Sequence, residues 1–573
     1  MIIYRVNMGD LSVKKEEVPQ EWQYLGGRAF TSAVVAKEVD PACNPMGAKN
    51  KLVFAPGLLS GTNAPNSGRM SVGAKSPLTG TIKESNVGGS ASQKLGKMNI
   101  KGIIIEGQPA EDKYYNLHVD KDGIKIQEET ELLGKGNYEV IDTLSKKHGD
   151  KIGVMTIGQA GEFRMAAANI SVKDYHGNIR SAGRGGLGAV MASKKIKYIT
   201  VDDTGAPGVP IANPEPFKAA ALRLGKALKE HPVTGQGLPT YGTNVLVNIL
   251  NEAGGLPTKN FRMGRFEGAH KISGEAMYEK IIDRKGKPTH NCHAGCVISC
   301  SQVYHDESGQ FVTAGFEYET IWGFGAVCLI DDLDIIAQAD RICDDIGIDT
   351  IETAVAVSTA MEGGVIEFGD GKGMLNLLNE IKKGTPLGRI IGNGAGFTGK
   401  AYGVTRVAVV KNQAIPAYDP RAVKGVGVTY ATTTMGADHT AGYAVATNIL
   451  KVGGFVSPLE KEGNIDLSRN LQIATAALDS TGLCLFVAFS ILDNPDAFQA
   501  IVDLVNAQCN LNMTGDDLNE MGKNVLRTER GYNIAAGFTA KDDQLPEFFS
   551  EDFPPHNKTW DFTTEELQEV WNF

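Results

Sequence analysis

The stretch HNCHAGCVISC, residues 290–300, places three cysteines at equal intervals of four residues. They are Cys292, Cys296 and Cys300, and His293 stands among them. Thiols grouped this closely are typical of a metal or iron–sulfur site, and buried structural cysteines are the plain alternative. Zinc sites usually present C-x-x-C knuckles in pairs, which this sequence lacks.

The spacing also limits the shape of this segment. In a straight helix, Cys292 and Cys300 would lie about 12 Å apart along the axis, at about 1.5 Å per residue, which is too far for thiolates that share one small cluster. We therefore expect a bend, and Gly295 is the residue best able to provide it. Cys484 is available far downstream as a fourth thiolate, so a cluster with four cysteine ligands, a zinc site and structural cysteines all stay open.

Composition narrows the class of protein. The chain has 573 residues, 42% of them hydrophobic, which is enough for two to four domains. The net charge is −10 and no basic run with interleaved aromatic residues occurs, so we expect no nucleic-acid partner. We see neither a signal-peptide pattern at the start nor a membrane-spanning apolar window, and we predict a cytoplasmic protein. A reducing compartment disfavours a disulfide knot among the 8 cysteines.

The chain divides into a strand-rich part and a helix-rich part. Short apolar runs bounded by turn residues recur from residues 2–7 to residues 195–201, and a Pro- and Gly-rich connector follows at 204–216. Helical periodicity then predominates, as in LDIIAQADRICDDIG at 333–347. We predict an α+β protein with a β-rich N-terminal domain followed by two mainly helical domains. The predicted domains are residues 1–207, 208–405 and 406–573.

A short motif, Asp-x-x-Gly-(Ile/Leu)-x, occurs twice, at residues 344–349 and 479–484. Each copy follows an amphipathic helix, so its glycine can end that helix, and two ordinary helix ends are the plain explanation. However, both copies place a carboxylate five residues before a potential ligand or recognition side chain, Asp349 or Cys484. We therefore predict that both copies contribute to a functional site.

Two nucleotide-like motifs are rejected. GRGGLG at 183–188 matches the dinucleotide fingerprint, but we expect no strand in the segment KDYHGNIRSA before it. GAGFTGKA at 394–401 resembles a phosphate loop, but it ends in Ala401 where a magnesium-binding hydroxyl is required. GRGGLG can still present backbone amides to another phosphate.

Six motifs along the chain, taken in order, resemble the tungsten-containing aldehyde ferredoxin oxidoreductase family over nearly all 573 residues. The resemblance implies a tungsten ion, less often molybdenum, held by the dithiolenes of two pterins (a bis-molybdopterin) beside one [4Fe-4S] cluster, with the cofactor at the domain interface. The motifs are GTNAPNSGRMSVGAKSPLTGTI (61–82), IRSAGRGGLGAVMASKKIK (179–197), LPTYGTNVLVNILNEAGGLPTKNF (238–261), FEYETIWGFGA (316–326), AYDPRA (417–422) and STGLCLF (480–486).

The resemblance implies ligands for the cluster. Three clustered cysteines and the cysteine of the second Asp-x-x-Gly motif bind it in the family, which assigns this role to Cys292, Cys296, Cys300 and Cys484. The family spacing is C-x-x-C-x-x-x-C, whereas this chain has three residues in each gap, which implies a shifted cluster or an altered potential. His293 is an alternative ligand that would raise the potential.

The resemblance also assigns residues to the pterins and to a Mg²⁺ ion that bridges their phosphates. Arg69, Arg180 and Arg184 suit phosphate and pterin oxygens, because a guanidinium presents a planar fork of donors. The backbone carbonyls of Asn86 and Ser181 match the magnesium-binding positions. The glycines that let the backbone approach the cofactor are Gly88, Gly89, Gly183, Gly185 and Gly186. The two Asp-x-x-Gly motifs contribute Asp344, Ile348, Asp349, Asp479 and Leu485.

Glu319 in EYETIW and His439 in GADHTAG match positions next to the metal in the family. A carboxylate can take a proton from the nucleophile, and an imidazole can donate to the carbonyl oxygen. Glu317 is the reserve base. The implied reaction converts an aldehyde to a carboxylic acid, with ferredoxin or a dedicated iron–sulfur subunit as electron acceptor.

The sequence also allows other functions. Ring reduction of an aryl-CoA thioester (benzoyl-CoA type) on the same scaffold is the main alternative. A non-catalytic electron-transfer subunit and a nicotinamide dehydrogenase, based on GRGGLG alone, rank below it. QADR at 338–341 lacks the Glu-x-x-His of a dimer-bridging iron site, so we expect no such iron, and the choice between homo- and hetero-oligomer stays open.

Overall fold

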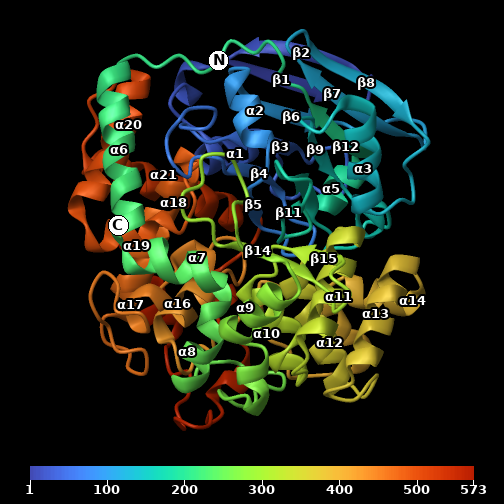
Figure 1. The fold of residues 1–573 in the computed structure, drawn as a ribbon, viewed down its shortest axis with the longest axis vertical. Helices are drawn as coiled ribbons and strands as arrows, with labels where there is room; N and C mark the ends of the chain where they lie inside the picture. The colour runs from blue at the N-terminus through green and yellow to red at the C-terminus, as the bar shows by residue number, and fades with distance from the viewer.

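Two six-stranded β-sheets form the N-terminal part of the protein, in a computed structural model that describes residues 1–573. Figure 1 shows them as the blue to teal strands of the upper half, with helices below and along the left side. The first sheet contains β1 (Ile2–Asn7), β2 (Ser12–Glu17), β3 (Leu52–Pro56), β4 (Met70–Lys75), β5 (Ile82–Val87) and β6 (Ile100–Glu106). The second contains β7 (Tyr114–Asp120), β8 (Gly123–Glu129), β9 (Gly153–Thr156), β10 (Ile170–Lys173), β11 (Ile179–Ala182) and β12 (Ile196–Val201).

The two sheets have the same topology. Their strand orders are β2-β1-β6-β3-β4-β5 and β8-β7-β12-β9-β10-β11, and in each sheet a single pair, β1–β6 or β7–β12, is parallel. The helices between the strands also correspond. They are α1 (Gly27–Glu38) and α2 (Ala91–Lys97) in the first unit, and α3 (Asn137–His148) and α5 (Leu187–Ser193) in the second, which also holds the short α4 (Gln159–Glu162). One folding pattern is therefore used twice in succession.

The shared pattern puts residues of the two units in equivalent places. Asn86 of β5 pairs with Ser71, and Ser181 of β11 pairs with Ser171, so Asn86 and Ser181 hold matching positions. A glycine-containing loop and a short helix follow each of these strands. The two sheets also share one apolar core, to which Phe54 of the first unit contributes.

Helices make up most of the remaining chain. The first set is α6 (Pro214–Glu230), α7 (Leu238–Tyr241), α8 (Leu246–Glu252), α9 (Gly274–Asp283), α10 (Tyr318–Phe324), α11 (Leu333–Ile346), α12 (Thr350–Glu362), α13 (Gly371–Lys383), α14 (Pro386–Gly392) and α15 (Ala395–Tyr402). The second set is α16 (Lys424–Thr432), α17 (Val445–Asn448), α18 (Asn464–Thr481), α19 (Val487–Asp493), α20 (Pro495–Cys509), α21 (Gly515–Ala535) and α22 (Thr564–Gln568). A five-residue π-helix, η2 (Val233–Gly237), precedes α7.

The α+β class is confirmed, with a β-rich N-terminal part and a mainly helical remainder. The boundaries at residues 207 and 405 stay predictions. The middle of the chain also contains a small sheet that the sequence did not predict, formed by β13 (Lys287–His290), β14 (Ser301–His305) and β15 (Phe311–Ala314). None of the helices has the length and apolar character needed to span a bilayer.

One expectation about GRGGLG was wrong. A strand, β11, does lead directly into this motif, and α5 follows it. The strand was not predicted because β11 has only four residues and lies at the edge of its sheet, where a strand needs few apolar residues. Alternating antiparallel pairs separate β11 from β12, so the two strands run in opposite directions and no parallel dinucleotide-binding unit results.

Both Asp-x-x-Gly motifs end helices, as predicted. Gly347 follows α11 with φ of 70°, and Gly482 follows α18 with φ of 83°. Glycine adopts this left-handed conformation without the steric cost that a Cβ imposes. The chain can therefore leave each helix sharply and turn the residues of each motif toward the sheets.

Candidate active site

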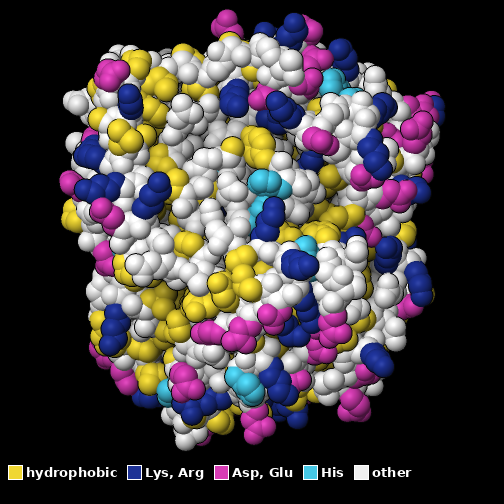
Figure 2. Space-filling view, viewed as in Figure 1, with side chains coloured by type: hydrophobic (Ala, Val, Ile, Leu, Met, Phe, Trp, Pro, Cys, Tyr) yellow, Lys and Arg dark blue, Asp and Glu magenta, His cyan; other side chains and the backbone are white.

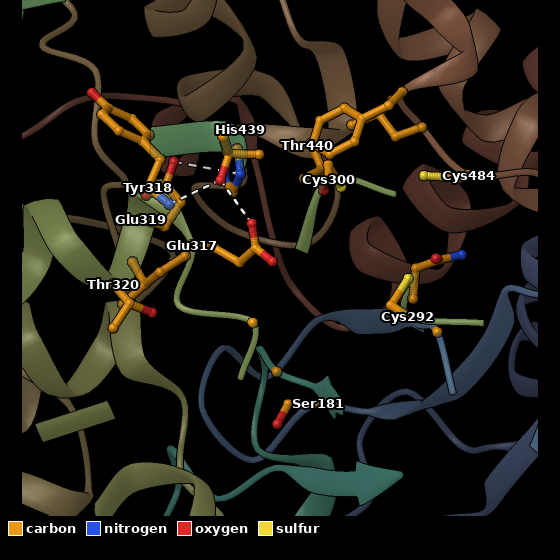
Figure 3. A pocket seen from close by; sticks show the side chains of 18 of the residues that line it. Ser181, Cys292, Cys300, Glu317, Tyr318, Glu319, Thr320, His439, Thr440 and Cys484 are labelled. Carbon is orange, nitrogen blue, oxygen red and sulfur yellow. Dashed lines mark hydrogen bonds and ion pairs between the residues drawn. The ribbon is translucent and has the colours of Figure 1, made fainter. Parts of the chain in front are cut away.

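A cavity of about 570 Å³ lies where the two sheets meet the helices. Strands β5 and β11, helix α10 and the ends of α11 and α18 all contribute to its walls, and Figure 3 shows one side of it. Most of the residues predicted from the sequence line this cavity. They are Arg69, Asn86, Gly88, Arg180, Ser181, Gly183, Arg184, Cys292, Cys300, Glu319, Asp344, Ile348, Asp349, His439, Asp479, Cys484 and Leu485.

Four predicted residues do not line the cavity: Gly89, Gly185, Gly186 and Cys296. Gly89 lies where the two units touch, because a Cβ there would meet the Val172 side chain at 2.6 Å. Gly185 lies over the stem of Lys83, because a Cβ there would meet its Cγ at 2.6 Å. Gly89 and Gly185 therefore serve close packing beneath the cavity, and both have positive φ angles.

The cysteine segment bends where the sequence predicted. Gly295 has φ of 79°, which a straight helix does not allow. Asn66 then joins this segment to the other cysteine. Its backbone N–H donates to the carbonyl of Gly295 at 2.9 Å, its carbonyl accepts from the N–H of Cys484 at 2.9 Å, and its side-chain amide lies 3.5 Å from Sγ of Cys296.

The four thiols are near one another without converging on one point. Burial, and then the charges of Cys292 and Cys484, raise the pKa of Cys296 to about 12. No group of three His, Cys, Asp or Glu side chains is placed to hold a single metal ion. A cubane cluster instead takes each thiolate on a different iron atom, so it needs ligands spread around it. The donor set fits a multi-iron cluster better than zinc.

His293 lies beside the first cysteine. Its Nδ1 is 3.2 Å from Sγ of Cys292, and its ring packs on Gly68, where any Cβ would overlap it. Burial opposes ionisation of Cys292, but the charge and hydrogen bond of His293 lower the pKa of that thiol to about 6. Nε2 of His293 is buried without a hydrogen-bond partner.

The three predicted arginines differ in their free donors. Arg180 binds Asp174 through Nε and Nη2 and the hydroxyl of Ser301 through Nη1. Arg184 donates to two backbone carbonyls and to Asp349. Arg69 is bonded only through Nε, which donates to Oδ1 of Asn86 at 2.6 Å. Its terminal nitrogens are therefore the most available donors for an anionic ligand.

Of the predicted aspartates, Asp349 and Asp479 are buried and Asp344 is half-buried, and the three lie in different surroundings. Burial raises the pKa of Asp479 to about 6, although Arg28 lies 3.4 Å from its carboxylate. Burial also raises the pKa of Asp344 well above its ordinary range. Asp349 caps α12 by accepting from the N–H groups of Ile351 and Glu352. Its carboxylate thus has less capacity left for a ligand than the other two.

The side chains of Glu319 and His439 lie next to each other in the wall of the cavity, as Figure 3 shows. Oε1 of Glu319 lies 3.4 Å from Nε2 of His439, and Oε2 accepts from the N–H of Ala417 at 3.0 Å. Burial raises the pKa of Glu319 to about 8 and lowers that of His439 to about 4. Oε1 of Glu319 and Nδ1 of His439 have no hydrogen-bond partner. Nδ1 of His439 is therefore free for a substrate, whereas Oε1 of Glu319 lies beside the imidazole.

Glu317, the reserve base, also lines the cavity. Its carboxylate accepts from the hydroxyl of Thr243 at 2.8 Å, and that hydroxyl in turn accepts from the N–H of Tyr318 at 2.9 Å. Burial raises the pKa of Glu317. The structure thus places both glutamates of the EYETIW motif at the cavity.

Sequence reasoning missed several charged residues that support this site. Lys83 of β5 binds the carboxylate of Asp438 at 3.3 Å, next to His439. Glu84 and Arg28 also line the cavity, and Oε1 of Glu84 is buried without a partner. In the sequence, only the position of Asp438 next to His439 indicated a role for it. Nothing in the sequence indicated that Lys83, Glu84 or Arg28 belongs to the site.

The residues present fit a large polar group with anionic parts. Asn86 Nδ2, Glu84 Oε1, Glu319 Oε1 and His439 Nδ1 are buried polar atoms that no protein group satisfies, which is costly unless a ligand pairs with them. A Cβ on Gly183 would have only one neighbour, at 3.6 Å, so this loop leaves room for a bulky group. With four cysteines alongside, the fold and site define a redox enzyme that binds a large cofactor.

Comparison with known proteins agrees with this class. Residues 3–203 match the family described as "Aldehyde ferredoxin oxidoreductase, N-terminal domain", and residues 219–571 match "Aldehyde ferredoxin oxidoreductase, domains 2 & 3". The chain therefore belongs to the aldehyde ferredoxin oxidoreductase family and is an oxidoreductase.

Its relatives are similar over nearly their whole length. The tungsten-containing aldehyde ferredoxin oxidoreductases of Pyrococcus furiosus and Thermococcus kodakarensis are each 36% identical over 96% of this chain and 91% of their own. A WOR-like subunit of an aliphatic sulfonate oxidoreductase from Pyrococcus furiosus is 24% identical. The fold also resembles the active-site complex BamBC of benzoyl coenzyme A reductase, with a TM-score of 0.81, 19% identity and coverage of 99% of this chain and 92% of that one. Family membership implies a tungsten–pterin cofactor.

Proposed function

We propose that this protein oxidises an aldehyde to a carboxylic acid in the cavity between the sheets and the helices. The aldehyde and one water yield the acid, two protons and two electrons, and the electrons pass to ferredoxin or to an iron–sulfur partner subunit. The observation that carries this proposal is the largely buried pair of Glu319 and His439, which lines the cavity together with three cysteines and holds polar atoms without a hydrogen-bond partner. A cytoplasmic location is part of the proposal.

A tungsten, or molybdenum, bis-molybdopterin would be held mainly by the N-terminal units. When bound, this group accepts the two electrons of the oxidation. Arg69 offers its free terminal nitrogens to phosphate or pterin oxygens. Asp344 and Asp479 offer carboxyl groups to the donor-rich edges of the two pterins. The duplication supports two similar cofactor halves, because each unit supplies one strand, one glycine-containing loop and one short helix.

A magnesium ion between the two pterin phosphates is also part of the proposal. The support is positional, since Asn86 and Ser181 occupy equivalent sites on β5 and β11. Magnesium prefers oxygen ligands in a near-octahedral arrangement, and backbone carbonyls satisfy that preference. The [4Fe-4S] cluster is assigned to Cys292, Cys296, Cys300 and Cys484, which Asn66 ties into one unit.

Glu319 and His439 have separate tasks. When Glu319 is protonated, its Oε1–H can donate to Nε2 of His439, which keeps the imidazole proton on Nδ1. That proton is then free to donate to the aldehyde oxygen and to stabilise the negative charge that develops there. When Glu319 is ionised, its carboxylate can accept a proton from the attacking water. Because the pKa of Glu319 is about 8, both forms are accessible near neutral pH.

The first experiment is anaerobic purification with elemental analysis and aldehyde assays. About one tungsten and about four irons per chain, with reduction of a low-potential dye by aldehydes, are expected. Four irons without tungsten or molybdenum, after expression in a host that makes the cofactor, would overturn the enzyme proposal. An aryl-CoA thioester with a strong reductant is the competing assay, because the benzoyl coenzyme A reductase complex shares this fold.

A further inference from the structure

A row of aromatic rings leads away from the Glu319–His439 pair. The ring centroids of His439 and Tyr443 are 6.3 Å apart, those of Tyr443 and Phe489 are 6.1 Å apart, and those of Phe489 and Phe486 are 6.0 Å apart. All four rings line the same cavity. Tyr443 meets Phe489 edge to face, at 89°, which is a preferred arrangement for aromatic pairs. A continuous aromatic wall therefore begins at the imidazole.

Apart from Thr243 and Thr440, the other side chains on this side of the cavity are apolar. The segment from η2 to α8 contributes apolar side chains, and η2 packs against α19, which carries Phe489. The aliphatic residues are Val233, Leu238, Val245, Leu246, Ile249 and Leu450. Pro232 also lines the cavity and is exposed to solvent. Figure 2 shows hydrophobic side chains in a band over the region of α19, α17 and α7.

Charge is distributed unevenly around the cavity. All of its lysines and arginines belong to the N-terminal units, at residues 28–184. The lining residues from 232–249, 440–450 and 485–489 include no charged side chain. A phosphate, sulfonate or carboxylate on the substrate would be desolvated there without a counter-ion, which is costly. An apolar group would instead gain from leaving water.

We propose that this aromatic wall selects neutral aldehydes that carry an aromatic ring next to the carbonyl, and that Phe489 is the specificity-determining residue. This inference rests on the proposed aldehyde oxidation. With the carbonyl oxygen at His439, a ring one bond away lies alongside Tyr443 and reaches Phe489. Short alkanals touch less of this wall, and anionic aldehydes are excluded by it.

The test compares catalytic efficiency for three aldehydes in the cofactor-loaded enzyme. We expect kcat/KM for benzaldehyde to exceed that for acetaldehyde, and kcat/KM for the anionic glyoxylate to be lowest. Phe489→Leu should lower the benzaldehyde-to-acetaldehyde ratio about tenfold, mainly through KM, because one aromatic contact is lost. Phe397→Leu is the matched control, since Phe397 is 49% exposed on α15 and outside the cavity.

Binding of benzamide, a neutral aryl ligand that is not oxidised, gives a readout independent of turnover. Calorimetry should show weaker binding to Phe489→Leu than to the wild type. If the wild type binds benzamide but oxidises no aldehyde, the proposed function fails while the aromatic wall stands. If aldehydes are oxidised but glyoxylate is preferred, or the ratio is unchanged in Phe489→Leu, the inference is overturned. Phe486→Leu serves as the second variant if Phe489→Leu does not fold with a normal tungsten content.

Discussion

Nε2 of His439 lies 3.4 Å from Oε1 of Glu319, and burial moves the pKa values of these two side chains in opposite directions. The carboxyl pKa rises to about 8 and the imidazole pKa falls to about 4, so between these values both groups are neutral. Burial disfavours the charged form of each group, which is why an acid and a base shift toward neutrality together. Between these pH values the pair therefore carries no net charge, and each of the two groups holds one proton.

The pH dependence of the reaction should report Glu319. Since the fraction of Glu319 in the base form grows as pH approaches its pKa, kcat/KM for an aldehyde should rise with pH toward about 8. No limb is expected near pH 6.5, because His439 is already neutral there. Glu319→Gln should lower kcat by about 10²–10⁴-fold with unchanged tungsten and iron contents. If kcat/KM of Glu319→Gln still rose toward pH 8 as in the wild type, the assignment would be contradicted.

The cluster ligands can be tested by iron content. Cys296→Ser should lose iron and the electron paramagnetic resonance signal of a reduced [4Fe-4S] cluster, because four thiolates hold such a cluster. Cys328→Ser is the control, since Cys328 is fully buried and bonded to the carbonyl of Gly323 away from the cavity. His293→Asn should keep all four irons. Loss of iron in that variant would make the histidine a ligand.

A buried ion pair joins the first unit to the C-terminal helices. Arg28 of α1 donates twice to Glu529 of α21, both at 2.9 Å, and the pair is almost completely buried. Glu529→Gln removes the carboxylate that pairs with the guanidinium through two hydrogen bonds and leaves only the more distant Asp479, at 3.4 Å, so we expect a loss of about 3 kcal/mol. Glu520→Gln, on the exposed face of the same helix, should change stability by less than about 1 kcal/mol. Urea denaturation at pH 7 measures both.

The same pair predicts an acid sensitivity. Burial opposes ionisation, but Arg28 holds the pKa of Glu529 below its ordinary value of 4.5. A carboxylate with a lowered folded pKa stabilises the protein above its unfolded pKa, and this contribution is lost as pH falls through the folded value. The wild type and Glu529→Gln should therefore converge in stability below about pH 4.5. Curves that stay parallel at lower pH would refute this.

The backbone at Gly57 packs closely against the backbone of the second Asp-x-x-Gly motif and helps to hold that motif in place. A methyl group on Gly57 would overlap the backbone of Gly482, two residues before Cys484. Gly57→Ala should therefore lower the melting temperature and the iron content together. Gly531→Ala, in α21 with open space around the added carbon, should leave the cluster intact and stabilise the protein by about 0.5–1 kcal/mol.

Local features of this fold could be predicted from the sequence, because they depend on neighbouring residues. The run at 195–201 forms β12, the periodic stretch at 333–347 forms α11, and Gly295 bends the cysteine segment. The edge strand β11 was missed since four residues give little periodicity.

Contacts between distant residues could not be predicted. Arg28 and Glu529 are separated by 501 positions, and Asn66 joins two cysteine segments that lie far apart in the chain. The duplication was also hidden, because equivalent residues such as Asn86 and Ser181 differ in chemistry and agree only in strand position. Such relationships become visible only when the sheets are assembled.

The repeated unit of the N-terminal part has an evolutionary consequence. Each unit covers one side of the cavity, and neither could enclose a ligand without the other. An ancestral chain of one unit would have met this need by pairing with a second copy of itself, and gene fusion would then have made the pair permanent. If the two units arose in this way, Asn86 and Ser181 would descend from one ancestral position, because they hold equivalent places on β5 and β11.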